Sequence, residues 1–112
     1  MNRYDFDKII HERARLLILI YLANDGKQQI PFNELKENLD LTAGNLSVQL
    51  SNLEQAGYIR IQKSFVSKRP VTNVSLTPEG LEALKRYMVE MEALIQTFKR
   101  SVMNEDRNNK KR

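Results

Sequence analysis

Apolar residues gather in the first quarter of the chain in a pattern that predicts a long helix over residues 6–24. From Leu16 to Ala23 they are continuous, so the second half of this helix is apolar on every side. Asp5 or Asp7 is expected near its start, and Gly26 lies past its end. A domain of 112 residues cannot easily cover such a helix alone, which predicts that a second chain packs against it.

Two short amphipathic segments come next and predict a helix-turn-helix. The stretch "QQIPF" reads as extended, because the residue before a proline is disfavoured in a helix. Asn33 is then the expected N-cap of a helix over "ELKENLD". Thr42 is expected to cap a second helix that runs to about Ala56 and is ended by Gly57. Two such helices joined by a tight turn form a helix-turn-helix.

The sequences "YIRIQKSF" and "VTNVSL" alternate between apolar and polar residues, which predicts a two-stranded β-hairpin over about residues 59–76. Its tip is expected over residues 64–70. Pro70 suits the margin of a hairpin but not a central strand. Phe65 is expected to pack beneath the hairpin rather than to stack on a base, and Tyr58 is expected to be a core residue.

The sequence Thr77-Pro78-Glu79 predicts the start of a final helix, because an N-cap hydroxyl is followed by proline and then by acid. Apolar residues then recur at alternating spacings of three and four over three heptads, at Leu81, Leu84, Met88, Met91, Ile95, Phe98 and Val102. Leu81 and Leu84 are expected to pack on the chain's own core. About 28 residues of helix extend roughly 42 Å. An 80-residue body is nearer to about 30 Å across, so the overhanging part needs a partner surface.

Length and charge refine this picture. Residues 1–104 are expected to form one domain, and residues 105–112, which contain no apolar side chain, a flexible basic tail. The net charge of +4 is uneven, since residues 60–69 contain four basic side chains and no acidic one. They are Arg60, Lys63, Lys68 and Arg69. Such a concentration suggests a polyanionic partner, and its plainer alternative is a solvated, charged hairpin.

Catalytic and metal chemistry find little support in the sequence. The chain has no cysteine and one histidine, His11, which we interpret as structural or interface-lining. No phosphate-binding glycine loop or catalytic triad can be assembled, so neither an enzyme nor a metal or other cofactor is expected. No signal peptide is visible, and the longest apolar run, eight residues, is far short of the roughly 18 that span a bilayer.

The order of helix, short strand, helix-turn-helix, hairpin and long helix is that of a winged helix-turn-helix domain. The stretches "FNELKENLDLTAGNLSVQLSNLEQAGYI" and "KSFVSKRPVTNVSLTPEG" closely resemble the small stand-alone winged-helix transcriptional regulators of the MarR and ArsR groups. The similarity covers roughly residues 9–95, and its most specific parts are "GNLS", "LE" with "AGY", and "RP" before "TPEG". The cysteines with which the ArsR group senses metals are absent, which argues against that kind of sensing.

This resemblance implies a mainly α (α+β) fold with a two-stranded β-wing and a long C-terminal dimerisation helix. It also implies a cytoplasmic, homodimeric repressor or activator that binds double-stranded DNA, with residues 42–56 in the major groove and the wing on the backbone or the minor groove. The sequence does not reveal the operator, the regulated genes, the sign of regulation or any small-molecule effector.

The residues themselves support a reading surface on the helix over residues 42–56. Its stretch from Leu41 to Leu53 contains no charged residue and many neutral donors and acceptors. Such groups can pair with base edges, whereas long charged side chains are drawn to phosphates. Gly44 allows a close approach to the backbone, and Thr42 with its neighbouring amides can hold a phosphate. The expected DNA-binding residues are Thr42, Gly44, Asn45, Ser47, Val48, Gln49, Asn52, Lys63, Lys68 and Arg69.

A homodimer is expected from the two apolar helices. The expected interface residues are Ile9, Ile10, Met88, Met91, Ile95, Phe98 and Val102. A twofold dimer would place its recognition helices about 34 Å apart, on successive major grooves of a near-palindromic site. The alternative is a protein-docking winged helix without DNA binding. Binding of single-stranded nucleic acid ranks last, because only Phe65 could serve as a stacking platform.

Overall fold

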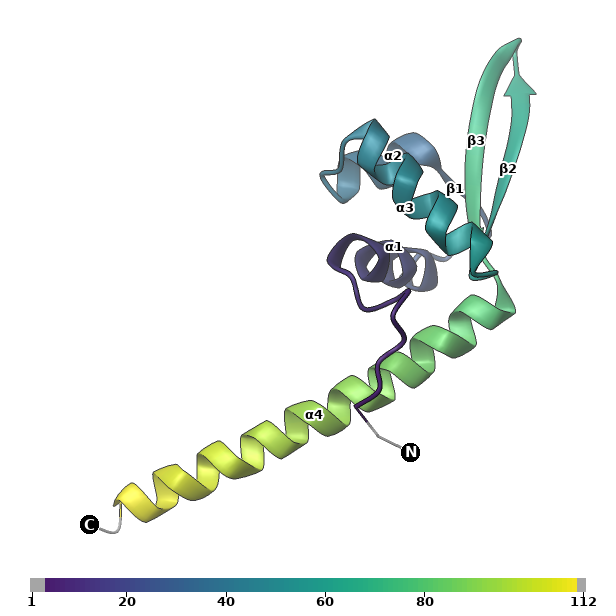
Figure 1. The fold of residues 1–112 in the computed structure, drawn as a ribbon. Helices are drawn as coiled ribbons and strands as arrows, with labels where there is room; N and C mark the ends of the chain where they lie inside the picture. Colours follow the sequence, from purple (N-terminus) through teal and green to yellow (C-terminus); the bar gives the residue numbers. More distant parts are fainter. Residues whose placement is uncertain (1–3, 111–112) are drawn as a thin grey trace.

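The computed structural model describes residues 4–110, with side chains described for residues 4–104. Figure 1 shows a small helical body, a projecting hairpin and a long helix that leaves the body. In chain order the elements are α1 (Arg13–Asn24), β1 (Ile30–Pro31), α2 (Phe32–Asn38), α3 (Ala43–Gln55), β2 (Ile59–Val66), β3 (Arg69–Leu76) and α4 (Pro78–Lys110). The predicted order of elements is therefore confirmed.

The three strands form one antiparallel sheet in the order β1-β3-β2. In the predicted hairpin β2–β3, Ile59 lies opposite Leu76. The short extended segment before α2 pairs with the base of β3, where Ile30 lies opposite Val74. The short strand predicted before the helix-turn-helix therefore joins the two-stranded wing in one sheet. Pro70 is tolerated in the middle strand because β1 does not reach that far along it.

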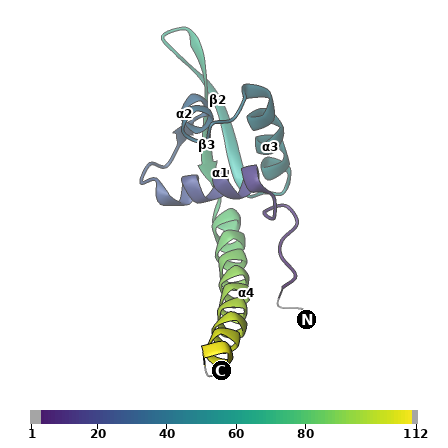
Figure 2. The same cartoon turned by 90° about the vertical axis from the view of Figure 1, so that its left-hand side faces the viewer.

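A single core joins the helices to the base of the sheet. Figure 2 shows α1 lying across the head of α4, with α2, α3 and the hairpin on the other side of α1. The fully buried side chains are Ile10, Ile18, Leu19, Ile30, Leu35, Leu46, Leu53 and Val74. They come from α1, α2, α3, β1, β3 and the segment before α1, so the body is held together by long-range apolar contacts.

Helix α1 starts later than its apolar pattern predicts. Glu12 is its N-cap, and the Glu12 carboxylate accepts hydrogen bonds from the amides of Ala14 and Arg15. The predicted start at residue 6 is wrong, because Asp7 instead accepts from the Ile9 amide at 2.8 Å and holds a separate turn. Seven of the eight residues from Leu16 to Ala23 are buried or half-buried by the chain itself. The apolar circumference of this helix is therefore covered without a second chain.

The segment before α1 ties the body to α4. The Tyr58 hydroxyl donates a hydrogen bond to the Asp7 carboxylate. Burial, together with this hydrogen bond, raises the pKa of Tyr58 to about 12, so the hydroxyl remains a donor at neutral pH. His11 lies in an aromatic cluster, since it stacks on Phe6 and its Nδ1 is 2.8 Å from the Tyr87 hydroxyl. The structural interpretation of His11 agrees with this placement.

Of the three predicted helix caps, two are confirmed and one is wrong. Thr42 caps α3, because its Oγ1 accepts from the Asn45 amide at 3.1 Å. Thr77 caps α4 in the same way, with the Gly80 amide 2.9 Å from its Oγ1. Asn33 does not cap α2, which begins two residues earlier than predicted, at Phe32 directly after Pro31, and has no side-chain cap. The strand β1 brings the chain to the helix start already extended, so the cap position falls on the proline.

Helix α4 has 33 residues and continues to Lys110. It therefore includes most of the segment that we predicted to be a flexible tail from residue 105, and residues 111–112 lie outside the described part of the chain. The polar sequence there does not stop the helix, because each added residue gains one hydrogen bond once a helix is formed. The long axis of the molecule measures 72 Å, against 30 and 25 Å across.

The first turns of α4 pack on the body through small and aromatic residues. Ala83, Leu84 and Tyr87 are buried in the core, whereas Leu81 is 36% exposed. The predicted role of Leu84 is confirmed and that of Leu81 is wrong. A strict heptad stripe drifts by about 20° per repeat around a straight helix, so its first member lies beside the contact face. Gly80 is the closest contact, since a Cβ there would be 2.1 Å from the Tyr58 carbonyl oxygen.

Candidate nucleic-acid interface

Helix α3 is fixed by one apolar stripe and leaves the rest of its surface to solvent. Leu46, Leu50 and Leu53 recur at helical spacing and are all buried. The N-cap at Thr42 and the positive φ of 81° at Gly57 define its two ends. The cap residue of a helix orients its first amides outward, where a phosphate can bind. Because α3 is anchored by its buried leucines and capped at its start, its exposed face has a fixed orientation relative to the body.

The structure places most of the predicted reading residues on this exposed face. Thr42, Gly44, Asn45, Ser47 and Val48 are exposed, and the Val48 side chain is 57% accessible. None of these five residues carries a charge, so the surface that they form offers hydroxyl, amide and methyl groups. Such groups match the donors, acceptors and thymine methyls of a DNA major groove.

Gln49 and Asn52 lie at the margin of this face, where they are half-buried. Arg15 of α1 donates from its Nη1 to the Gln49 Oε1 at 2.8 Å. Gln49 in turn donates from its Nε2 to the Asn45 Oδ1 at 3.1 Å. The sequence analysis missed Arg15, because it is separated from Gln49 by 34 residues and no local pattern links them.

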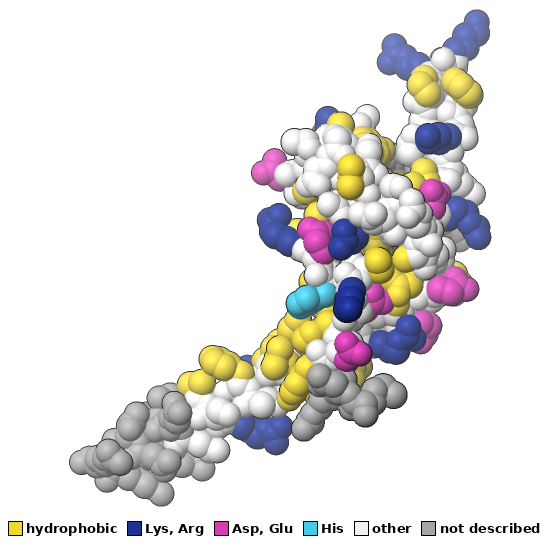
Figure 3. All heavy atoms as spheres, in the orientation of Figure 1, with side chains coloured by type: hydrophobic (Ala, Val, Ile, Leu, Met, Phe, Trp, Pro, Cys, Tyr) yellow, Lys and Arg dark blue, Asp and Glu magenta, His cyan; other side chains and the backbone are white. Residues whose placement is uncertain are grey.

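The wing carries its cations on an extended hairpin. The strands continue to Val66 and Arg69, so the predicted tip over residues 64–70 shortens to a two-residue turn. Ser67 and Lys68 have φ values of 52° and 66°, as a tight hairpin turn requires. Figure 3 shows basic side chains at the far end of the hairpin. Lys63, Lys68 and Arg69 are exposed, as is Arg60.

Phe65 does not pack beneath the hairpin. It is 76% exposed, and its neighbour Val66 is 59% exposed. The prediction is wrong because the hairpin projects away from the body, so nothing lies beneath its outer half (Figure 1). Among the residues that the structure describes, the wing cations enter no salt bridge, since the ion pairs are Arg15–Glu12, Lys27–Glu34 and Lys85–Glu82. Their charge is thus available to an outside polyanion.

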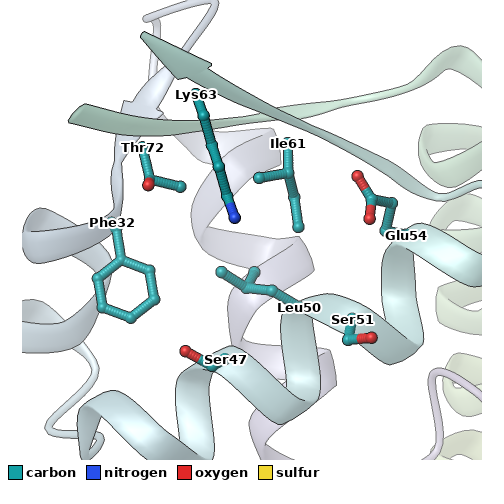
Figure 4. Close-up of a pocket in the computed structure, with 8 residues that line it drawn as sticks. All are labelled: Phe32, Ser47, Leu50, Ser51, Glu54, Ile61, Lys63 and Thr72. Atoms are coloured by element: carbon teal, nitrogen blue, oxygen red, sulfur yellow. The ribbon is translucent and has the colours of Figure 1, made fainter. Parts of the chain in front are cut away.

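A groove of about 670 Å³ separates α3 from the wing. Its lining residues are Phe32, Ser47, Leu50, Ser51, Glu54, Ile61, Lys63 and Thr72. Figure 4 shows the Lys63 side chain reaching from β2 toward α3, with Ser47 and Ser51 on the opposite wall. The groove brings together two predicted residues, Ser47 and Lys63. Lys68 and Arg69 do not line it, because they lie at the end of the hairpin.

Three polar lining residues were missed by the sequence analysis. Ser51 follows Ser47 by one helical turn, so helical spacing alone could have identified it. Thr72 lies opposite Lys63 in the hairpin register, which the alternating pattern also contains. Glu54 places one carboxylate at the inner end of the groove and would repel a phosphate there. A nucleic-acid backbone would therefore favour the outer part of the groove, between Ser47 and Lys63.

The predicted dimer residues fall into two groups. Ile10 is 0% exposed within the single chain, so it belongs to the core and is not available to a partner. Ile9 and Met91 are half-buried against the same core. The others form an exposed stripe along the part of α4 that leaves the body (Figure 3). Their exposed fractions are 37% for Met88, 38% for Ile95, 65% for Phe98 and 36% for Val102.

Two further findings concern the described residues. None of their helices is both long and apolar enough to cross a membrane. No group of three or more His, Cys, Asp or Glu side chains within the described part of the chain could hold a metal ion.

Comparison with known proteins agrees with the winged-helix fold described above. The family described as winged helix DNA-binding domain matches residues 14–95. An uncharacterized protein of Methanocaldococcus jannaschii is 38% identical over 79 residues, which are 70% of this chain and 82% of that protein. An uncharacterized HTH-type transcriptional regulator of Bacillus cereus is 36% identical over 73 residues, or 65% of this chain. The match covers 47% of the Bacillus protein, so the chain spans about half the length of that relative.

Solved structures share the fold. A transcriptional regulator homologue from Pyrococcus horikoshii superposes with a TM-score of 0.73 at 33% identity, over 80% of this chain and 87% of that one. MepR, a transcription regulator of the Staphylococcus aureus multidrug efflux pump MepA, superposes with a TM-score of 0.67 at 20% identity, over 97% of this chain and 75% of that one. Solved structures at about a fifth identity show the fold alone.

Proposed function

The chain belongs to the family of winged helix DNA-binding domains, and from this premise we propose that it is a cytoplasmic homodimer that regulates transcription by recognising a specific duplex DNA sequence. Its family and its relatives make it a DNA-binding regulator rather than an enzyme. The proposal adds the sequence specificity, the dimer and the groove assignments. In it α3 enters the major groove, and the wing lies on the adjoining backbone and minor groove.

One observation carries the proposal: Ser47 of the uncharged α3 face and Lys63 of the cationic wing border the same groove. Ser47 lies on one wall and Lys63 on the other (Figure 4). A DNA strand between them would meet neutral groups on the side of its bases and cations on the side of its phosphates. Phosphate contacts supply affinity and base contacts supply specificity. This division of chemistry matches the two jobs that a sequence-specific regulator performs.

The free length of α4 supports a homodimer. The described residues have a radius of gyration of 18.4 Å, whereas a compact chain of this length would have about 13 Å. Leu94, Ile95, Phe98 and Val102 are exposed on the part of the helix that extends from the body. A second copy supplies the same stripe, and a twofold pairing covers both. Such a pairing gives two reading helices for a site with two similar halves.

The test is selection of bound fragments from genomic DNA by the purified protein. The proposal expects recovered fragments to share a near-palindromic sequence whose half-sites are about one helical turn apart. Recovery of unrelated fragments would contradict sequence specificity. Negligible affinity for any duplex even at low salt would instead favour the protein-docking alternative, in which the same groove holds a polypeptide.

The wing assignment predicts a change in salt dependence. Replacing Lys68 and Arg69 with alanine is expected to weaken binding to every duplex, cognate or random, because both cations would neutralise phosphates. The slope of log K against log salt should fall in magnitude by about 0.9 for each phosphate that is no longer neutralised. Titrations at several salt concentrations measure it. The double variant Lys99→Ala, Arg100→Ala removes the same charge from α4 and is the control. An equal slope change in both would contradict the wing assignment.

A further inference from the structure

We infer that Arg15, which lies on α1 and outside the reading helix, sets the hydrogen-bonding polarity of that helix, so that Asn45 presents donors to the DNA. The inference rests on the proposed function and specifies the bases that it selects. Arg15 acts here as a positioning residue through Gln49. The consequence is a preference for base edges with acceptors at the position under Asn45.

The Arg15 guanidinium is held in place by the chain around it. Its Nε donates to the Ile9 carbonyl oxygen at 2.5 Å, and its side chain is only 16% exposed. The Glu12 carboxylate, which caps α1, lies 4.0 Å from its Nη1. The guanidinium therefore reaches Gln49 from an anchored position at the edge of α3, and it does not rotate freely in solvent.

The orientation of the Gln49 amide follows from this anchor. A guanidinium has five donors and no acceptor, so the Gln49 atom that faces Arg15 must be the carbonyl oxygen. The Nε2 group of the Gln49 amide then points away from Arg15 and faces Asn45. Because an NH2 group donates, the facing atom of Asn45 must be its Oδ1. The chain Arg15 to Gln49 to Asn45 thus runs in one direction only.

This direction leaves one polar atom of the two amides without a hydrogen bond inside the protein. Both polar atoms of Gln49 and the Asn45 Oδ1 each already form one. The Asn45 Nδ2 makes no hydrogen bond among the described residues, and the side chain is exposed. Bidentate pairing with adenine needs one acceptor and one donor of the same amide. In this mode the Asn45 Oδ1 would have to accept from a base and from Gln49 at once, whereas donation from its Nδ2 alone competes with no hydrogen bond inside the protein.

An amide that turns its NH2 group toward the DNA selects bases by their acceptors. In the major groove guanine presents two acceptors, adenine and thymine one each, and cytosine only a donor. At the position under Asn45 we therefore expect guanine to be favoured over cytosine by roughly tenfold, the low end of discrimination for a specific base contact. The position is identified as the one whose preference is lost in Asn45→Ala.

Two variants change the relay in different ways. Arg15→Met removes the donors with little loss of volume and is expected to reduce the guanine preference to within about twofold of cytosine. Arg15→Lys keeps a donor-only group and should retain it. Arg13→Met removes an exposed cation of the same helix and is the control. Binding to the four base variants of the selected site measures each preference, and circular dichroism checks the fold.

Gln49→Glu is the sharper variant, since it lies at the helix surface and should fold. Glutamate accepts from both Arg15 and Asn45, so the Asn45 amide must turn to donate, which leaves its Oδ1 facing the DNA. The preferred base is then expected to change toward cytosine or adenine, whose exocyclic amines donate. The added carboxylate should weaken binding to all four variants alike, which does not alter their order.

The outcomes separate this inference from the proposed function. A wild-type protein that selects no common sequence ends the proposed function. A wild-type protein that selects a site while Arg15→Met and Gln49→Glu keep its base preference at every position overturns only the inference. Loss of preference in Arg15→Met together with a changed base in Gln49→Glu supports it.

Discussion

Replacing Phe98 with glutamate is expected to convert the protein to a monomer and to weaken its binding to a two-half-site duplex by about a hundredfold or more. Phe98 is 65% exposed on the free part of α4 and lies between Ile95 and Val102 on the same stripe. In a twofold pair both copies of the new carboxylate would enter the apolar contact, where an unpaired charge is costly. Each monomer then binds one half-site alone, without the gain from linkage.

The measurements are the molar mass in solution by light scattering and the affinity for the selected duplex. Gln96→Glu introduces the same charge on the opposite side of α4, at an exposed position, and should remain dimeric. Circular dichroism distinguishes a folded monomer from an unfolded chain. A Phe98→Glu protein that keeps the wild-type mass, or a wild-type protein that is monomeric at micromolar concentration, would disprove the proposed pairing.

Gly80→Ala is expected to lower the midpoint of thermal unfolding by roughly 5–15 °C, since overpacking of this kind costs on the order of 1–3 kcal/mol. The new methyl group would be 2.1 Å from the Tyr58 carbonyl oxygen and 2.9 Å from the Leu76 Cδ1. The first of these atoms belongs to the backbone, so relief requires a shift of α4 against the start of β2. The Thr77 amide, which donates to the same Tyr58 carbonyl at 3.1 Å, would move with it.

Gly26→Ala is the matched control, because its added methyl group meets no atom within 4 Å. Thermal unfolding of both variants and of the wild type is followed by circular dichroism at one protein concentration, since a dimer unfolds in a concentration-dependent way. Equal midpoints for the two variants would show that the junction between α4 and the sheet yields easily. A large loss in Gly80→Ala alone would show that this junction is rigid.

The parts of the fold that the sequence predicts well are those set by neighbours along the chain. Thr42 and Thr77 cap their helices as expected, because a capping hydroxyl acts on an amide three residues away. The buried leucines of α3 likewise recur at helical spacing, and apolar and polar residues alternate along β2 and β3. The helix-turn-helix and the wing therefore follow from local pattern.

The errors come from contacts between distant segments. Residues 6–12 have a helical pattern, but Phe6 and His11 pack with Tyr87 in an aromatic cluster and the helix starts at Arg13. Ile10 was predicted to contact a second chain, but it is buried in the core of its own chain. Phe65 looked like a packing residue because sequence alone does not tell how far a hairpin projects from its body.

The candidate site shows the same division. The exposed residues of α3 follow from the position of its buried leucines, so their placement was predictable. Their hydrogen-bonding state was not, because it depends on Arg15, which approaches from another helix. Sequence thus gives the surface chemistry of the reading helix, and the structure adds which atoms of that surface remain available.

Helix α4 joins the body at a close contact and continues as one unbroken rod, and this has a mechanical consequence. At the usual rise its 33 residues extend roughly 50 Å. Over that length one degree of tilt displaces the far end by about 0.9 Å. In the proposed dimer the angle at which two rods cross thus sets the separation of the two reading heads, and a tilt of a few degrees would move them out of step with the DNA.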